Sequence, residues 1–201
     1  MDIKGFEKTL FKSNQSRTFL SCVWRKISKA IGDELTKETK KPSVVILCIG
    51  NEERGDDAFG PHVAKNIKRL KKKGLVEIID CGTVPENYTD VIRRIKPTHV
   101  IIVDAVDFKG SPGDIILSFE PTISEVSIST HKPSLTLLTK FIQSTIGSKI
   151  ILLGVQPKSI EWGLSMSDEV VAASNVVIKA LKSVIRRVRR TVIEQSQAVS
   201  P

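Results

Sequence analysis

The chain has 201 residues, a length that suits one domain with a sizeable core rather than two domains. It carries 31 Lys and Arg residues against 22 Asp and Glu, a formal net charge of +9, and 40% of its residues are hydrophobic. This composition is typical of a globular protein and excludes wholesale disorder. The positive charge leaves nucleic acid or an anionic membrane surface as a candidate partner. No apolar run approaches the ~18 residues of a transmembrane helix, so we expect no membrane insertion.

The cysteines and the N-terminus indicate a cytoplasmic protein. Cys22, Cys48 and Cys81 are odd in number, widely spaced and without a CxxC pair, so we expect neither a disulfide framework nor a structural zinc site. Free thiols fit a reducing compartment. Charged residues also interrupt any apolar core of a signal peptide, namely Lys4, Glu7, Lys8 and Lys12.

Residues 1–42 differ in pattern from the rest and predict an N-terminal helical arm in front of an α/β domain at 43–201. Apolar residues recur at helical spacing and predict an amphipathic helix from about 15 to 36: Leu20, Val23, Trp24, Ile27 and Ile31. Pro42 follows two lysines and ends this segment. Two interpretations stay open, a helix packed against the domain and a mobile helix that seeks a partner.

From residue 43 onward, short apolar runs alternate with amphipathic stretches. Strands are predicted at 44–49, 76–79, 99–103, 114–119 and 150–155, and helices at 57–71, 85–95, 133–145 and 167–192. The spacing from Thr83 to Glu86 matches a capping box at the start of the second helix. Continuous apolar strands separated by helices predict a three-layer α/β sandwich with a mostly parallel sheet of about five strands.

The strand at 114–119 must run against its neighbours. Only a loop rich in Gly and Pro separates it from the strand that ends at Val103, whereas a parallel crossover needs a dozen or more residues. We therefore predict an antiparallel strand at an edge of the sheet.

Acidic residues follow the predicted parallel strands where ligands bind in open α/β sheets, beyond the carboxyl ends. Asp57 follows the first strand and Asp104 ends the third. His131 precedes the helix that leads into the last strand, which places it at the same edge. Two carboxylates and one imidazole suit a borderline divalent ion such as zinc or nickel. We predict that Asp57, Asp104 and His131 face one cleft.

Five short motifs resemble, in order, those of the hydrogenase maturation protease family, over about residues 43–185. They are Cys48-Ile49-Gly50-Asn51 with Gly55-Asp56-Asp57 and Gly60-Pro61, then Asp80-Cys81-Gly82-Thr83-Val84-Pro85-Glu86-Asn87, Ile102-Val103-Asp104-Ala105-Val106-Asp107, Ser129-Thr130-His131, and Leu153-Gly154-Val155-Gln156-Pro157. The last block is most similar to members that process energy-conserving hydrogenases of the formate hydrogenlyase type.

The resemblance implies a cytoplasmic endopeptidase that removes a C-terminal extension from the large-subunit precursor of a nickel-iron hydrogenase after nickel insertion. It implies that Asp57, Asp104 and His131 are both the catalytic and the metal-binding residues. The nickel would arrive with the substrate, and no organic cofactor is expected. We further expect a monomer whose partner is the precursor, with no nucleic acid bound.

Two other classes of function remain as alternatives. The same fold could bind a metal or the precursor without catalysis, or the basic charge could direct binding to nucleic acid or a membrane surface. The basic residues cluster in the last turns of two predicted helices, where the helix dipole favours cations: Lys65, Lys68, Arg69, Lys71, Lys72 and Lys73, and then Lys182, Arg186, Arg187, Arg189 and Arg190.

Several residues near the motifs have simpler structural interpretations. Asp56 directly precedes a predicted helix, and a helix N-cap explains it. His62 and His99 have no acidic partner at useful spacing and are expected to be structural or exposed. Cys48 and Cys81 are expected to be buried, inert thiols.

Overall fold

The computed structural model describes residues 8–12, 17–37, 41–121 and 132–197 of the chain. The strands are β1 (Lys8–Phe11), β2 (Val44–Cys48), β3 (Val76–Asp80), β4 (His99–Ala105), β5 (Ile115–Phe119) and β6 (Lys149–Val155). The α-helices are α1 (Arg17–Lys37), α2 (Phe59–Ile67), α3 (Thr89–Ile95), α5 (Lys132–Phe141) and α6 (Asp168–Gln197). Short helical turns complete the chain: η1 (Gly55–Ala58), η2 (Lys68–Leu70), η3 (Pro85–Tyr88) and η4 (Ile142–Ile146).

The strands form one sheet in the order β1-β5-β6-β4-β2-β3. β3, β2, β4 and β6 run parallel, and β5 runs antiparallel to both β6 and β1. The predicted α/β fold with a mostly parallel sheet is confirmed, as is the antiparallel direction of the strand at 114–119.

Two details of the predicted sheet differ. The sheet has six strands because Lys8–Phe11, within the segment expected to be a helical arm, pairs with β5. β1 is the outermost strand on this side of the sheet, so β5 is the second strand rather than the predicted edge strand. A run of four residues carries too little periodicity to be recognised as a strand without its partner.

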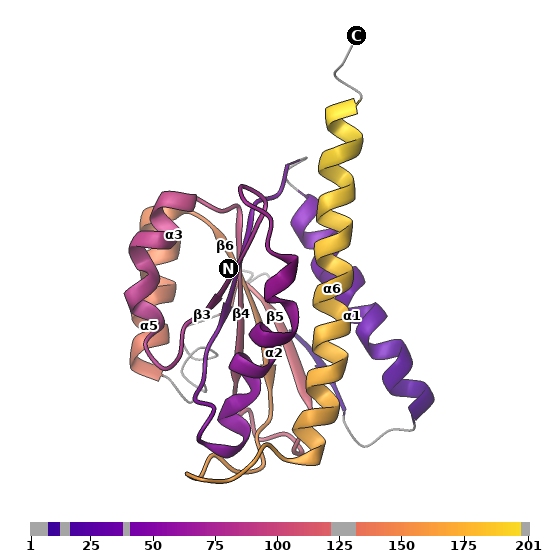
Figure 1. Ribbon diagram of the computed structural model, residues 1–201, viewed down its shortest axis with the longest axis vertical. Coiled ribbons are helices and arrows are strands. Elements are labelled where there is room, and N and C mark those ends of the chain that lie inside the picture. Colours follow the sequence, from indigo (N-terminus) through magenta and orange to yellow (C-terminus); the bar gives the residue numbers. More distant parts are fainter. Residues whose placement is uncertain (1–7, 13–16, 38–40, 122–131, 198–201) are drawn as a thin grey trace, which may run out of the picture.

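Helices cover both faces of the sheet, with α3 and α5 on one side and α1, α2 and α6 on the other (Figure 1). Alternate residues of β2 point to opposite faces, so Ile46 packs in one hydrophobic cluster and Leu47 in the other. The three predicted layers follow from this arrangement. Among the described residues, no helix is long and apolar enough to cross a membrane.

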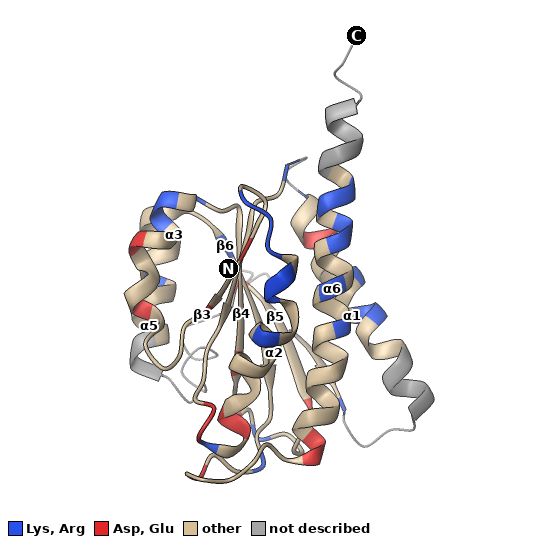
Figure 2. Cartoon of the chain, in the orientation of Figure 1, with Lys and Arg blue, Asp and Glu red and all other residues tan. Residues whose placement is uncertain are grey.

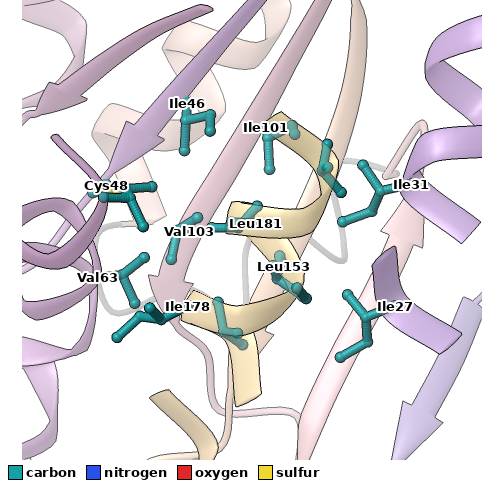
Figure 3. Packing of buried hydrophobic residues seen from close by; sticks show 14 of the residues in the cluster. Ile27, Ile31, Ile46, Cys48, Val63, Ile101, Val103, Leu153, Ile178 and Leu181 are labelled. Carbon is teal, nitrogen blue, oxygen red and sulfur yellow. The ribbon is translucent and has the colours of Figure 1, made fainter. Parts of the chain in front are cut away.

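Helix α1 packs against the sheet and α6, which is the first of the two interpretations of the N-terminal segment. Ile27, Ile31 and Leu35 are completely buried. Figure 3 shows Ile27 and Ile31 in the same cluster as Leu181 of α6 and Leu153 of β6. The apolar stripe read from the sequence is therefore the packing surface of α1.

The predicted capping box before α3 is wrong. Val84, not Thr83, is the N-cap residue of η3, and no side-chain hydrogen bond caps this turn. Pro85 occupies its first position, where a missing N–H group costs nothing.

Candidate functional site

The carboxyl ends of β2, β3, β4 and β6 lie side by side at one edge of the sheet. Cys48 at the end of β2 is in register with Asp80 of β3 and Val103 of β4, and Val103 with Leu153 of β6. The segments that follow these strands therefore share this edge, which we call the carboxyl edge.

Two close approaches of the backbone fix the turn that carries Asp57. A Cβ atom at Gly50 would lie 1.9 Å from the carbonyl oxygen of Asp57, and one at Gly60 would lie 2.0 Å from that of Ile49. The second residue after β2 and the second residue of α2 thus require glycine. Because of this packing, η1 lies against Gly50, just beyond β2, and contacts β4.

The structure brings Asp57 and Asp104 to the carboxyl edge on adjacent elements. Asp104 lies near the end of β4, and the amide of Ile49, just after β2, donates to the carbonyl of Val103 at 2.9 Å. Both side chains are almost fully buried, with 1% exposure for Asp57 and 0% for Asp104. Carboxylates are retained in such surroundings when they are hydrogen-bonded, ion-paired or bound to a metal.

His131 lies outside the described residues, so its place relative to the two carboxylates remains a prediction. Helix α5 begins at the next residue, Lys132, and packs against η3, the turn that follows β3. Within the described ranges, no group of three or more His, Cys, Asp and Glu side chains is placed to hold a metal ion.

Two buried thiols lie beside the acidic residues of this edge. Burial raises the pKa of the Cys81 thiol, and the negative charges of Asp80 and Asp104 raise it further. Burial likewise raises the pKa of Cys48, with smaller contributions from Cys81 and Asp80. Protonated, buried thiols are poor nucleophiles, in agreement with the inert role expected for them.

Asp56 is not a helix N-cap, contrary to the sequence-based interpretation. Arg54 occupies the N-cap position of η1, and the buried Asp56 carboxylate instead binds the segment between β6 and α6. Its Oδ2 accepts from the amides of Lys158 at 2.7 Å and Ser159 at 3.2 Å and from the Ser167 hydroxyl at 3.0 Å, and its Oδ1 accepts from the Ser167 amide at 2.6 Å. Partners more than 100 positions away leave no local signal in the sequence.

A second network connects the loop after β4 to the end of β6. The buried Gln156 donates from Nε2 to Asp107 at 3.1 Å and accepts from the amide of Gly110 at 3.0 Å. The Lys109 ammonium 2.6 Å from Asp107 lowers the pKa of that carboxyl, and the Gln156 hydrogen bond lowers it further. Gln156 belongs to the fifth motif, but only the structure shows that it holds this loop.

The other two histidines were expected to be structural or exposed, and His99 is buried at the start of its strand while His62 is half-buried. His99 begins β4 at the opposite edge of the sheet, is 2% exposed, and its Nδ1 lies 2.8 Å from the Thr98 hydroxyl. His62 lies on α2, where partial burial lowers its pKa and the charge of Lys65 lowers it further.

The segment 157–167 also presents apolar side chains that no motif indicated. Trp162 is 63% exposed and Leu164 is 46% exposed. The guanidinium of Arg54 lies over the indole of Trp162, 5.6 Å from the ring centroid. A single Trp in a loop gives no periodic pattern, so sequence reasoning had no means to separate it from an ordinary surface residue.

Comparisons with known proteins agree on one family. A family model described as hydrogenase maturation protease matches residues 61–184. The hydrogenase 3 maturation protease of Escherichia coli K12 is 34% identical over 139 residues, which cover 69% of this chain and 88% of that protein.

A solved structure agrees with this assignment. The crystal structure of a NiFe hydrogenase maturation protease from Thermococcus kodakarensis is 34% identical with a TM-score of 0.68, and the match covers 78% of this chain and 99% of that one. An Escherichia coli endopeptidase solved in solution is 31% identical with a TM-score of 0.59, over 68% of this chain and 87% of that one.

Proposed function

The chain belongs to the hydrogenase maturation protease family and is a peptidase of that family. From this premise we propose that it cleaves a nickel-loaded hydrogenase large-subunit precursor, with its own Asp57, Asp104 and His131 as the catalytic and metal-binding residues. The reaction is the removal of a C-terminal extension once nickel has been inserted into the precursor. The observation that carries the assignment is the burial of two carboxylates, Asp57 and Asp104, on adjacent elements at the carboxyl edge.

The donor chemistry suits recognition of an ion that belongs to the substrate. Carboxylate and imidazole ligands accept a borderline divalent ion and leave coordination positions open for groups that the precursor already supplies. Cys48 and Cys81 are buried beside this edge, and burial raises the pKa of each thiol. The ion is therefore treated as part of the substrate rather than as a resident cofactor.

In the proposed reaction, Asp57, Asp104 and His131 hold the substrate-borne ion so that the scissile peptide lies beside it. Hydrolysis then adds the hydroxyl of water to the carbonyl carbon and a proton to the leaving amine. Ion binding contributes by polarising the carbonyl or activating the water, and the buried setting strengthens both effects because little solvent screens the charges. Cleavage therefore depends on prior insertion of nickel into the precursor.

Substitution of each acid by its amide tests the assignment. Asp57→Asn and Asp104→Asn keep the side-chain volume but remove the charge, and His131→Ala removes the imidazole. We expect each change to lower the rate of cleavage of nickel-loaded precursor by about 100-fold or more, measured as loss of the C-terminal peptide by mass spectrometry. Asp90→Asn, an exposed acid on α3, is the control. Unchanged cleavage in all three variants would contradict the assignment of these residues.

Binding without cleavage in the same assay would instead support a non-catalytic metal- or precursor-binding protein. For the cellular setting we propose a monomer in the cytoplasm that uses no organic cofactor and binds no nucleic acid. The described cysteines are all free, with Cys22 exposed and the other two buried, and this supports a reducing compartment.

A further inference from the structure

The segment Lys158–Leu164, which we call the anchored loop, is held tightly to the turn that carries Asp57. Three backbone hydrogen bonds join them: Asp56 N to Ser159 O at 2.9 Å, Gly55 N to Leu164 O at 3.0 Å and Gly163 N to Glu53 O at 2.9 Å. The Asp56 carboxylate and the Arg54 side chain, whose Nε donates to Ile160 O at 3.2 Å, add further bonds. The loop is therefore preorganised at the carboxyl edge.

This preorganised loop exposes large apolar side chains. Trp162 is 63% exposed and Leu164 is 46% exposed, although backbone hydrogen bonds hold the loop before Trp162, at Ser159, and after it, at Gly163 and Leu164. Aromatic side chains on a rigid support are typical centres of protein interfaces, because little conformational entropy is lost when a partner covers them. Arg54 covers one face of the indole and leaves the remainder of the ring available.

Two exposed acidic residues belong to the same part of the surface as Trp162. Glu53 shares a backbone hydrogen bond with Gly163, Glu161 precedes Trp162, and both side chains are exposed. None of the ion pairs formed between described residues includes Glu53 or Glu161. A partner that covers Trp162 would thus meet an apolar centre with the Arg54 cation on one face of the ring and the Glu53 and Glu161 carboxylates as exposed acids without an ion pair among the described residues. Basic side chains of a partner could pair with these two carboxylates.

We propose that the anchored loop is a docking surface for the hydrogenase large-subunit precursor, with Trp162 and Leu164 as its apolar centre and Glu53 and Glu161 as its rim. The inference rests on the proposed function. It identifies a surface, separate from the catalytic residues, that binds the substrate protein. The loop is bonded to the turn of Asp57, so a protein bound there keeps its chain next to the two buried carboxylates.

The same observations disfavour two other occupants. A symmetric dimer built on this loop would place the Glu53 and Glu161 carboxylates of both copies in one interface, which costs free energy unless cations pair with them. An anionic membrane surface would be opposed by the exposed Glu53 and Glu161 carboxylates, which lack an ion pair among the described residues. The precursor, in contrast, must bind at the carboxyl edge for the proposed cleavage to take place.

The test measures binding separately from cleavage. Nickel-free precursor, which the proposed function leaves uncut, is titrated into the full chain by calorimetry. We expect Trp162→Ala to weaken binding about tenfold or more, Leu164→Ala to weaken it a few-fold, and Trp162→Phe to keep most of the affinity. The matched control is Leu137→Ala, because Leu137 is also apolar and 62% exposed but lies on α5. Circular dichroism checks that each variant is folded.

Two further measurements separate the docking surface from the proposed function. In a Trp24→Phe background the emission of Trp162 should shift to shorter wavelength on addition of precursor, because the indole leaves water. If the wild-type chain cleaves nickel-loaded precursor and Trp162→Ala does so with unchanged KM, the docking surface is wrong and the function stands. If Trp162→Ala weakens binding but the wild-type chain never cleaves, the docking surface stands and the proposed function fails.

Discussion

The two ends of the sheet differ in charge: acidic residues gather at the carboxyl end with a few basic ones among them, whereas basic residues predominate at the opposite end (Figure 2). The carboxyl edge holds the buried Asp56, Asp57 and Asp104, together with exposed glutamates of the neighbouring loops. At the opposite end, α2 and η2 are followed by lysines and arginines, and α6 carries arginines toward its C-terminus. The excess of positive charge therefore lies mostly at the end of the molecule opposite the candidate active site.

The two ends also differ in how their charged groups are held. The Asp56 carboxylate accepts four hydrogen bonds from distant residues, whereas Lys68, Arg69, Lys72 and Lys73 are exposed on the surface. Buried, multiply bonded charges fix structure, while exposed ones mostly complement helix dipoles and are screened by salt. The following substitutions test this contrast.

Removal of the Asp56 carboxylate should have the largest effect on stability. Asp56→Ala leaves three backbone N–H groups and one hydroxyl without their acceptor, and we expect a loss of about 4 kcal/mol in the free energy of unfolding. Chemical denaturation monitored by circular dichroism measures this loss. Asp56→Asn should lose less, because an amide oxygen still accepts. A loss below 1 kcal/mol for Asp56→Ala would contradict the anchoring role.

Gly50→Ala should come next, because its Cβ atom would lie 1.9 Å from the carbonyl oxygen of Asp57. The matched control is Gly74→Ala, where φ is also positive, at +75°, but no atom lies within 4 Å of the added Cβ. Backbone strain alone should cost the control about 1 kcal/mol, and we expect Gly50→Ala to cost about 2 kcal/mol more. Equal losses in the two variants would show that the close approach is unimportant.

The ion pair of Asp107 should give a small dependence of stability on pH. The pKa of Asp107 is lowered below its ordinary value of 3.8, first by Lys109 and then by Gln156. A depressed pKa contributes stability that is present above the unfolded pKa and lost as the pH falls through the folded value, so the effect lies below about pH 4. Asp107→Asn should flatten the acid side of the stability curve. Because the Asp107 side chain is 46% exposed, the change should be modest.

Neutralisation of the opposite end should have the smallest effect. A variant with Lys68, Arg69, Lys72 and Lys73 replaced by Gln should unfold within about 0.5 kcal/mol of the wild-type chain. Its cleavage of precursor should be unchanged at physiological salt. A loss of cleavage of tenfold or more would show that this basic end takes part in substrate binding.

The regular elements were predictable because each carries its own periodic pattern. The apolar runs of β2 and β4 and the stripe of α6 were recognised from neighbouring residues alone, and the parallel strands then placed Asp57 and Asp104 at one edge. The direction of β5 followed from the shortness of its connection. In these cases, local sequence and chain length contain the whole argument.

Contacts between distant residues could not be predicted in the same way. β1 is a strand because β5 offers it a free edge, and Asp56 became an anchor because Ser167 lies opposite it. A four-residue run carries no periodic pattern of its own. An aspartate before a helix has a simpler local interpretation as an N-cap, and that interpretation was wrong here.

The sequence by itself determined the α/β class, the family resemblance and the two acidic positions, because strand periodicity and short motifs are local properties. Only the tertiary structure decided that Asp57 and Asp104 are buried on adjacent elements, that Asp56 binds the anchored loop, and that Trp162 of this loop is exposed. Each of these depends on which side chains meet across the sheet edge, and the meeting is set by packing of the entire chain. The difference in charge between the two ends has the same origin, since folding separates charges that the sequence only counts.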